Sequence, residues 1–199
     1  RLAKQSKALL ISLKEFPPDV TARLSRLTDL GFHRGDSVRT YILDEPCDTF
    51  AEYYDSRSKR TRANMRKYFR QLEEAQITWE TRWGKDGVAE IYTDEVHQLY
   101  EAVYQRAEMK FEHLPPEFFR ELARQCPETS RFTLFRNGDR IVGFCAALVS
   151  SERYDLVYCG FDYEMNEGTS LYFNLLYRGV EDGYDRGRQE IHIGAAADE

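Results

Sequence analysis

Long apolar runs are missing from this sequence. None approaches the ~18–20 consecutive apolar residues that a membrane-spanning helix needs. The chain also opens without the basic, apolar and small-residue pattern of a secretory signal. Its first residue is Arg1 rather than Met and it stops at IHIGAAADE, so we expect one or both ends of a longer chain to be missing. These features predict a cytoplasmic protein.

Patterns that bind metals or form disulfides are missing as well. No two of the four cysteines form a Cys-x-x-Cys pair, and Cys145 and Cys159 fall inside apolar, strand-like runs, where cysteine usually behaves as a small buried hydrophobic residue. The four histidines, His33, His97, His113 and His192, lie far apart. We therefore predict no metal site and reduced cysteines.

One segment of this acidic chain lacks acidic residues. The whole chain has a net charge of −6, but residues 56–70, SRSKRTRANMRKYFR, carry seven basic residues and no acidic one, so the remainder is at −13. The segment predicts an amphipathic helix that continues through QLEEA, with an apolar stripe that includes Met65 and Leu72. The basic residues of the predicted helix are Lys59, Arg62, Arg66 and Arg70 on one face, with Arg60 and Lys67 beside them.

The order of the predicted elements indicates an α+β fold. At 199 residues the chain has one or two domains and can bury a core. We predict helices over 17–32, 56–75, 93–109, 112–127 and 170–184, and strands over 8–16, 37–45, 76–80 and 189–194. Between them, residues 131–162 predict three antiparallel strands with an Asn137-Gly138-Asp139 hairpin turn. The unit over 154–194 is long enough for a parallel crossover.

The segment DYEMNEGTSLY (162–172) connects a predicted strand to a predicted helix. The start of a helix leaves backbone N–H groups without partners, and these groups can bind an anion. Gly168, Thr169 and Ser170 are therefore candidates for a phosphate cradle. The alternative is structural: Thr169 or Ser170 caps the helix, and Gly168 permits the turn.

Four segments together resemble the GNAT acyltransferase superfamily. They are SKRTRANMRKYFRQLEEAQI, the three-strand region with FRNGDRIVGFCAALVSSERYDLVYCGFD, EGTSLYFNLLYRGVEDGYDRG, and the terminal EIHIG. Their order is similar to the branch with the Fem-type aminoacyltransferases and the acetyltransferase-like proteins of cellulose or peptidoglycan biosynthesis. The resemblance implies a mostly antiparallel sheet flanked by helices. It also implies that 1–50 close a preceding GNAT-like half-domain and that 51–199 form the acyltransferase domain.

The resemblance further implies where an activated donor would bind. GNAT proteins bind the pyrophosphate of an acyl-coenzyme A at a loop with the pattern Gln/Arg-x-x-Gly-x-Gly/Ala, which falls here on Met165, Gly168 and Ser170. Met165 departs from this pattern. Fem-type members also lack the full pattern and use aminoacyl-tRNA. The donor carbonyl would lie between two diverging strands, at the backbone of Cys159, Gly160 and Phe161.

Acyl transfer to an amine needs a base for the proton of the attacking nitrogen and donors for the oxyanion. Asp162 is a candidate base just past a strand end, His192 lies on the last strand, and Tyr172 could protonate a leaving group. No Ser-His-Asp or Cys-His pattern is visible, so we expect direct attack in a ternary complex. Lys59, Arg60, Arg62 and Arg66 would bind phosphates of the acceptor or of tRNA.

The expected function is therefore transfer of an acyl or aminoacyl group, from acyl-coenzyme A or aminoacyl-tRNA, to the amine of a small molecule or a cell-wall precursor. Two other classes of function stay open. One is a GNAT-like protein that binds without catalysis in cell-wall or polysaccharide assembly, which the departure at Met165 favours. The other is a nucleic-acid-binding module that uses only the basic helix over 56–70.

Overall fold

The computed structural model describes residues 11–13, 16, 18–35, 40–43, 45, 47–108, 110, 113–188 and 190–194. The chain divides into two compact units, Arg1–Arg39 and Thr40–Glu199. In the first, a 3-10 helix (η1, Pro18–Leu24) and α2 (Arg26–Asp29) replace the single predicted helix over 17–32. Residues 11–13 form no strand, and most of the predicted strand over 8–16 lies outside the described residues. That 1–50 close a preceding half-domain stays a prediction.

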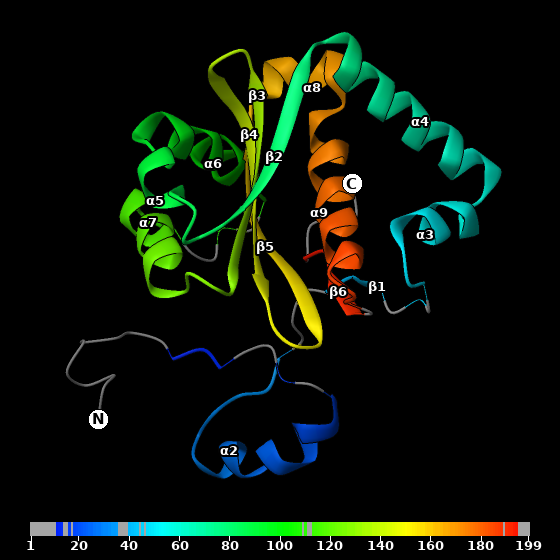
Figure 1. Cartoon of the computed structure of the whole chain (residues 1–199). Coiled ribbons are helices and arrows are strands. Elements are labelled where there is room, and N and C mark those ends of the chain that lie inside the picture. Colours follow the sequence, from blue (N-terminus) through cyan, green and yellow to red (C-terminus); the bar gives the residue numbers. More distant parts are fainter. Residues whose placement is uncertain are drawn as a thin grey trace. The chain divides into compact units, whose positions relative to one another are not determined.

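The second unit contains a six-stranded mixed sheet in the order β1-β6-β5-β4-β3-β2 (Figure 1). The strands are β1 (Ile42–Leu43), β2 (Ile77–Trp83), β3 (Ser130–Asn137), β4 (Arg140–Val149), β5 (Arg153–Phe161) and β6 (Glu190–His192). Among the strand pairs that the structure describes, only β5–β6 is parallel. The predicted α+β fold, its three-strand region and its parallel crossover are confirmed. The strand predicted over 37–45 is confirmed in the described residues only at β1.

Helices cover both faces of this sheet (Figure 1). On one face lie α5 (Val88–Ile91), α6 (Asp94–Arg106) and α7 (Pro116–Gln125), and on the other lie α3 (Phe50–Ser56), α4 (Lys59–Glu74), α8 (Tyr163–Thr169) and α9 (Leu171–Asp185). Side chains alternate along β3, so that Phe132 and Leu134 join the core under α5–α7 and Phe135 joins the core under α9. The sheet is thus the middle of three layers.

The predicted long helices are present, although α4 begins three residues and α7 four residues after the predicted start. Ser58 caps α4 by accepting from the backbone N–H of Thr61 at 3.1 Å. Thr93 caps α6 as predicted, with its hydroxyl 3.4 Å from the N–H of Val96. Pro116 is the first residue of α7. The basic helix, α4, is therefore confirmed as an element of the fold, 16 residues long.

A buried ion pair fixes α9 to the sheet. The Arg131 guanidinium on β3 donates two hydrogen bonds to the Asp182 carboxylate on α9, at 3.0 and 2.5 Å, and the Tyr154 hydroxyl donates a third at 2.9 Å. The Arg131 side chain is only 4% exposed and that of Asp182 12%. Burial favours the neutral form of Asp182, but the hydrogen bond and charge of Arg131 outweigh burial, so the pKa of Asp182 lies below its usual value.

Candidate active site

The candidate active site begins where β5 and β6 separate. Their parallel pairing runs from Arg153 opposite Glu190 to Asp155 opposite His192. In the described part of β6, no later pairing with β5 occurs, although β5 continues to Phe161. A bulge at Val157 interrupts the pairing of β5 with β4 in the same region. This end of β5 therefore carries backbone groups that β6 does not cover.

Cys159, Gly160 and Phe161 form this end of β5, where each of them is packed against a neighbouring element or residue. Gly160 lies against α6 so closely that an added Cβ would be 2.5 Å from the backbone nitrogen of Tyr100. Cys159 lies opposite Cys145 on β4. Burial raises the pKa of Cys159 to about 11 and that of Cys145 well above its usual value, so both thiols are neutral near pH 7. Only the backbone of these three residues can contact a donor as predicted.

The segment that follows β5 is a helix and not the predicted loop. Residues Tyr163–Thr169 form α8 because Asp162 caps it: its Oδ1 accepts from the N–H groups of Glu164 at 3.0 Å and Met165 at 3.2 Å. Arg140 on β4 donates to the other carboxylate oxygen at 2.8 Å. All of these bonds hold Asp162 in a structural position beside the candidate site.

The turn between α8 and α9 differs from the predicted one. Ser170, and not Gly168, adopts the left-handed conformation, at φ 51° and ψ 40°. Ser170 is the N-cap residue of α9, as the structural alternative predicts, but its hydroxyl does not accept from the helix. The Thr169 hydroxyl donates to Met165 O and that of Ser170 donates to Gln71 Oε1, each at 2.8 Å. The side-chain cap of α9 comes from Asn166, whose Oδ1 accepts from the N–H of Tyr172 at 2.8 Å.

The N-terminus of α9 is packed against α4. Beside the bond between Ser170 and Gln71, the rings of Tyr68 and Phe173 stack at 4.5 Å. The fully buried Asn174 donates to the carbonyl of Tyr68 at 3.1 Å. The hydroxyls predicted to hold a phosphate thus already have protein partners, which a phosphate would have to displace. A phosphate site at Gly168–Ser170 stays a prediction.

Replacing Asn166 with alanine removes the cap of α9. We expect the free energy of unfolding to fall by about 1 kcal/mol, because the N–H of Tyr172 loses its acceptor. Asn166→Asp keeps an acceptor at this position and should restore most of the loss. Urea denaturation of the three proteins measures this, and equal stability of wild type and Asn166→Ala would show that Asn166 is not the cap.

The three candidate catalytic residues are not brought together. Tyr172 lies beside the end of β5, with its ring 5.6 Å from that of Phe161, which precedes Asp162. His192 lies opposite Asp155 and close to its carboxylate at 3.1 Å and to that of Glu190 at 2.5 Å. Seven residues separate Asp155 from Asp162 along the chain, which is about 23 Å at the rise of a strand. His192 therefore cannot act with the other two residues at one reacting atom.

Some basic side chains of the predicted face of α4 have partners within the protein, and others do not. Arg62 donates to the carbonyls of Asp55 and Arg57 at 2.8 and 2.7 Å and so holds the end of α3. Arg66 donates to the Tyr54 hydroxyl at 2.8 Å. Arg70 lies 3.6 Å from Glu74, so this glutamate pairs part of the charge. Three exposed cations have no ion pair or hydrogen bond among the described residues: Lys59, Arg60 and Lys67.

Two further features bear on function. No described helix has the length and apolar character that crossing a membrane requires. Within the same residues, no cluster of three or more histidine, cysteine or acidic side chains is placed to hold a metal ion.

Three solved structures have a similar fold. One is the C-terminal domain of a protein named as a lysylphosphatidylglycerol synthetase, from Agrobacterium fabrum. It has 16% sequence identity and a TM-score of 0.59, and the match covers 90% of this chain and 52% of that one. A second is L-PGS from Bacillus licheniformis, with 14% identity, a TM-score of 0.58, and coverage of 90% and 52%. A third is FemX, with 11% identity, a TM-score of 0.57, and coverage of 89% and 60%.

These identities show a shared fold, and this chain spans little more than half the length of the three structures. No curated protein sequence matches the chain. The acetyltransferase (GNAT) domain family matches residues 59–199, which is most of the chain and includes α4, the sheet from β2 to β6, and α9. The predicted resemblance is confirmed, and the chain belongs to the GNAT acetyltransferase domain family.

Proposed function

We propose that this domain transfers an aminoacyl group from aminoacyl-tRNA to an amine. The observation that carries the proposal is the packing of α4 across the N-terminus of α9. There, Gln71 holds the Ser170 hydroxyl, and Asn166 holds the N–H of Tyr172. The position at which GNAT proteins bind the pyrophosphate of coenzyme A is therefore partly filled by the protein itself. Met165, in place of the usual Gln or Arg, removes one more phosphate contact.

The free cations of α4 supply phosphate contacts at a second place. Lys67 lies one helical turn from Gln71, and Lys59 lies eight residues before Lys67, about 12 Å along the helix axis. Exposed lysine and arginine side chains bind the phosphates of nucleic acid by charge. We assign Lys59, Arg60 and Lys67 to the tRNA, in place of the Arg62 and Arg66 side chains that hold α3.

The reaction would occur at the uncovered end of β5. The acceptor nitrogen attacks the ester carbonyl of the aminoacyl group, a C–N bond forms, and the C–O bond to the tRNA ribose breaks. The proton of the amine leaves with the ribose oxygen or passes to solvent. Backbone groups of Cys159–Phe161 would orient the carbonyl, Tyr172 would lie near the leaving oxygen, and Asp162 would position α8. Such a route depends on orientation more than on an activated side chain.

The similar structures support an aminoacyl donor. The name lysylphosphatidylglycerol synthetase describes a product that carries a lysyl group. FemX is a further similar structure, and the resemblance to the Fem-type branch implies an aminoacyl-tRNA donor. By analogy with the Fem-type branch, the acceptor would be the amine of a cell-wall precursor. This analogy rests on the fold and does not fix the substrate.

Binding of charged tRNA tests the role of α4. We expect the triple variant Lys59→Gln/Arg60→Gln/Lys67→Gln to bind at least 10-fold more weakly in fluorescence anisotropy at low salt. The slope of log affinity against log salt should fall by about 2–3, since each lost phosphate contact removes about 0.7–0.9. The matched control is Lys85→Gln/Arg124→Gln/Arg153→Gln, which removes the same charge from other exposed positions.

Three outcomes would contradict the proposal. Equal losses in both triple variants would show a general charge effect and no site on α4. Equal affinity for charged tRNA, uncharged tRNA and arbitrary RNA would favour the nucleic-acid-binding alternative. Binding of charged tRNA without transfer to any amine of a cell-wall precursor would favour the non-catalytic one.

A further inference from the structure

The strand β2 forms one edge of the sheet. It pairs with β3 over all seven residues, from Ile77 opposite Asn137 to Trp83 opposite Arg131, and it ends the strand order. In the described part of the unit from Thr40 onward, its other side has no neighbouring strand. Such a row of unpaired N–H and C=O groups is a template for another strand, and natural proteins usually block it with a bulge, a proline or a cover. The register between β2 and β3 is continuous, and ITWETRW contains no proline.

The side chains of β2 alternate between an aromatic and a charged face. Trp79 points toward α9, where the Arg178 guanidinium lies 3.9 Å from its ring centre, and Trp83 faces Arg186 of the same helix at 4.6 Å. Glu80 and Arg82 lie on the opposite face, 2.8 Å apart. Trp79 is 39% exposed, although it is one of the two largest side chains of the strand. Pairing of this edge with another strand would cover the exposed part of Trp79.

The sequence of β2 is complementary to itself around Thr81. If two copies pair antiparallel with Thr81 opposite Thr81, each Glu80 lies opposite an Arg82 and each Trp79 lies opposite a Trp83. The two copies would be related by a two-fold axis perpendicular to the sheet, which places the α9-facing sides of both sheets on the same side. Directly opposite residues of the two β2 strands must therefore point to the same side of the sheet. Moving the centre to Glu80 opposes two glutamates, and moving it to Arg82 opposes two arginines. A centre at Trp79 would also oppose two indoles, but it places each Glu80 opposite a Thr78 and forms no opposite-charge pair. The register centred on Thr81 is therefore the one that combines charge pairing with aromatic pairing.

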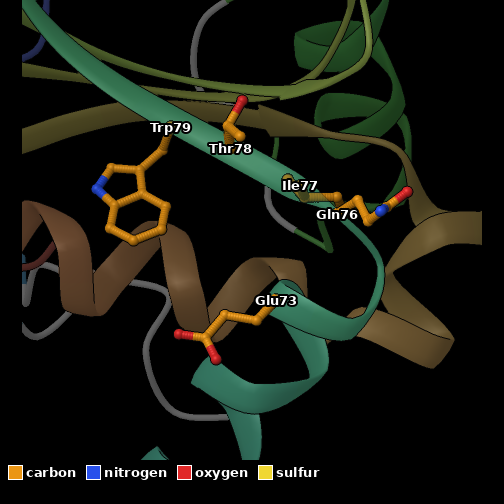
Figure 2. A pocket seen from close by; sticks show the side chains of 5 residues that line it. All are labelled: Glu73, Gln76, Ile77, Thr78 and Trp79. Carbon is orange, nitrogen blue, oxygen red and sulfur yellow. The ribbon is translucent and has the colours of Figure 1, made fainter.

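A pocket at the start of β2 fits the same arrangement. It has a volume of about 430 Å³ and is lined by Glu73, Gln76, Ile77, Thr78 and Trp79 (Figure 2). In Figure 2, Trp79 and Thr78 project to opposite sides of the strand, and Glu73 lies at the end of α4 nearby. In the register centred on Thr81, the end of the second copy's β2 lies beside this pocket. The second copy would bring the indole of its Trp83 toward the apolar wall of this pocket.

The geometry points to a homodimer in which two copies of this chain pair through β2, antiparallel and centred on Thr81. The pairing would join two six-stranded sheets into one continuous sheet, bury both exposed Trp79 side chains and fill two pockets. The inference is independent of the proposed transfer reaction, because β2 and the uncovered end of β5 are separated by β3 and β4.

Charge reversal and mixing test this pairing. Light scattering after size-exclusion chromatography should give twice the 23.4 kDa of one chain for the wild type. Glu80→Arg places arginine opposite arginine and should give monomers, and Arg82→Glu places glutamate opposite glutamate with the same result. An equimolar mixture of the two variants restores every opposite-charge pair. We expect this mixture to dimerise although neither variant does so alone.

The mixture distinguishes loss of the interface from misfolding, because a misfolded variant would not dimerise with the other variant. Glu121→Arg on α7 is the control reversal at an exposed residue and should leave the dimer intact. A wild-type monomer at 100 μM, a dimer that survives both single reversals, or a mixture that stays monomeric would each overturn the proposal.

Discussion

Replacing Asp182 with asparagine lowers the free energy of unfolding by about 3–5 kcal/mol. The substitution leaves the guanidinium of Arg131, which is 4% exposed, without its counter-charge, and removing one partner of a buried pair costs this much. The Tyr154 hydroxyl also loses its charged acceptor. Guanidinium denaturation of the two proteins at pH 7 measures the difference.

The control for this prediction is an exposed pair of the same type. Lys85 and Glu128 approach to 2.8 Å, but their side chains are 47% and 68% exposed. Glu128→Gln should change the stability by less than about 0.5 kcal/mol, since water and salt screen such pairs. A loss for Asp182→Asn no larger than for Glu128→Gln would show that the Arg131–Asp182 pair does not hold α9.

The Arg131–Asp182 pair makes the free energy of unfolding depend on pH. Because the pKa of Asp182 is lowered in the folded state, its stabilising effect is complete above the unfolded value of about 3.9 and is lost as pH falls through the folded pKa. The stability difference between wild type and Asp182→Asn should therefore be constant from pH 7 to 5 and shrink below pH 4.

Replacing Gly160 with alanine lowers the free energy of unfolding by about 3 kcal/mol, which is the upper end of the range for inserting extra atoms into a packed core. The new Cβ would lie 2.5 Å from the nitrogen of Tyr100 and 2.6 Å from the carbonyl carbon of Leu99, and both are backbone atoms that cannot turn away. Either β5 or α6 must shift, at the strand end where we place the donor. Thermal and urea denaturation give the stability cost.

Gly168→Ala is the matched control. An added Cβ there meets nothing within 4 Å, and the position is inside α8, where alanine is the better helix former. We expect no loss, and a gain of up to about 1 kcal/mol. If Gly160→Ala and Gly168→Ala changed the free energy of unfolding equally, α6 and β5 would not be in close contact at Gly160.

The sequence predicted the elements of the sheet unit well, because their patterns are local. The hairpin at Asn137-Gly138, the cap at Thr93 and the amphipathic face of α4 each depend on residues that are neighbours in the chain. The order of these elements then favoured the GNAT fold, which the family match confirms.

The site was harder to predict, because its contacts join distant residues. Ser170 bonds to Gln71, which lies 99 residues earlier in the chain, and Arg131 bonds to Asp182, which lies 51 residues later. The local sequence pattern also assigned the left-handed turn to Gly168, because glycine is the usual residue for that conformation. In the structure, Ser170 adopts it. The Asp162 cap followed by Asn166 was the available signal for α8 and for the cap of α9.

The central claim is that the donor is aminoacyl-tRNA and not acyl-coenzyme A. Calorimetric titration tests it most directly, first with acetyl-coenzyme A and then with charged tRNA, on the wild type and on Gly168→Trp, whose side chain has open space at its Cβ. We predict no micromolar binding of acetyl-coenzyme A by either protein, and binding of charged tRNA by the wild type. Micromolar binding of acetyl-coenzyme A that Gly168→Trp abolishes would contradict the claim.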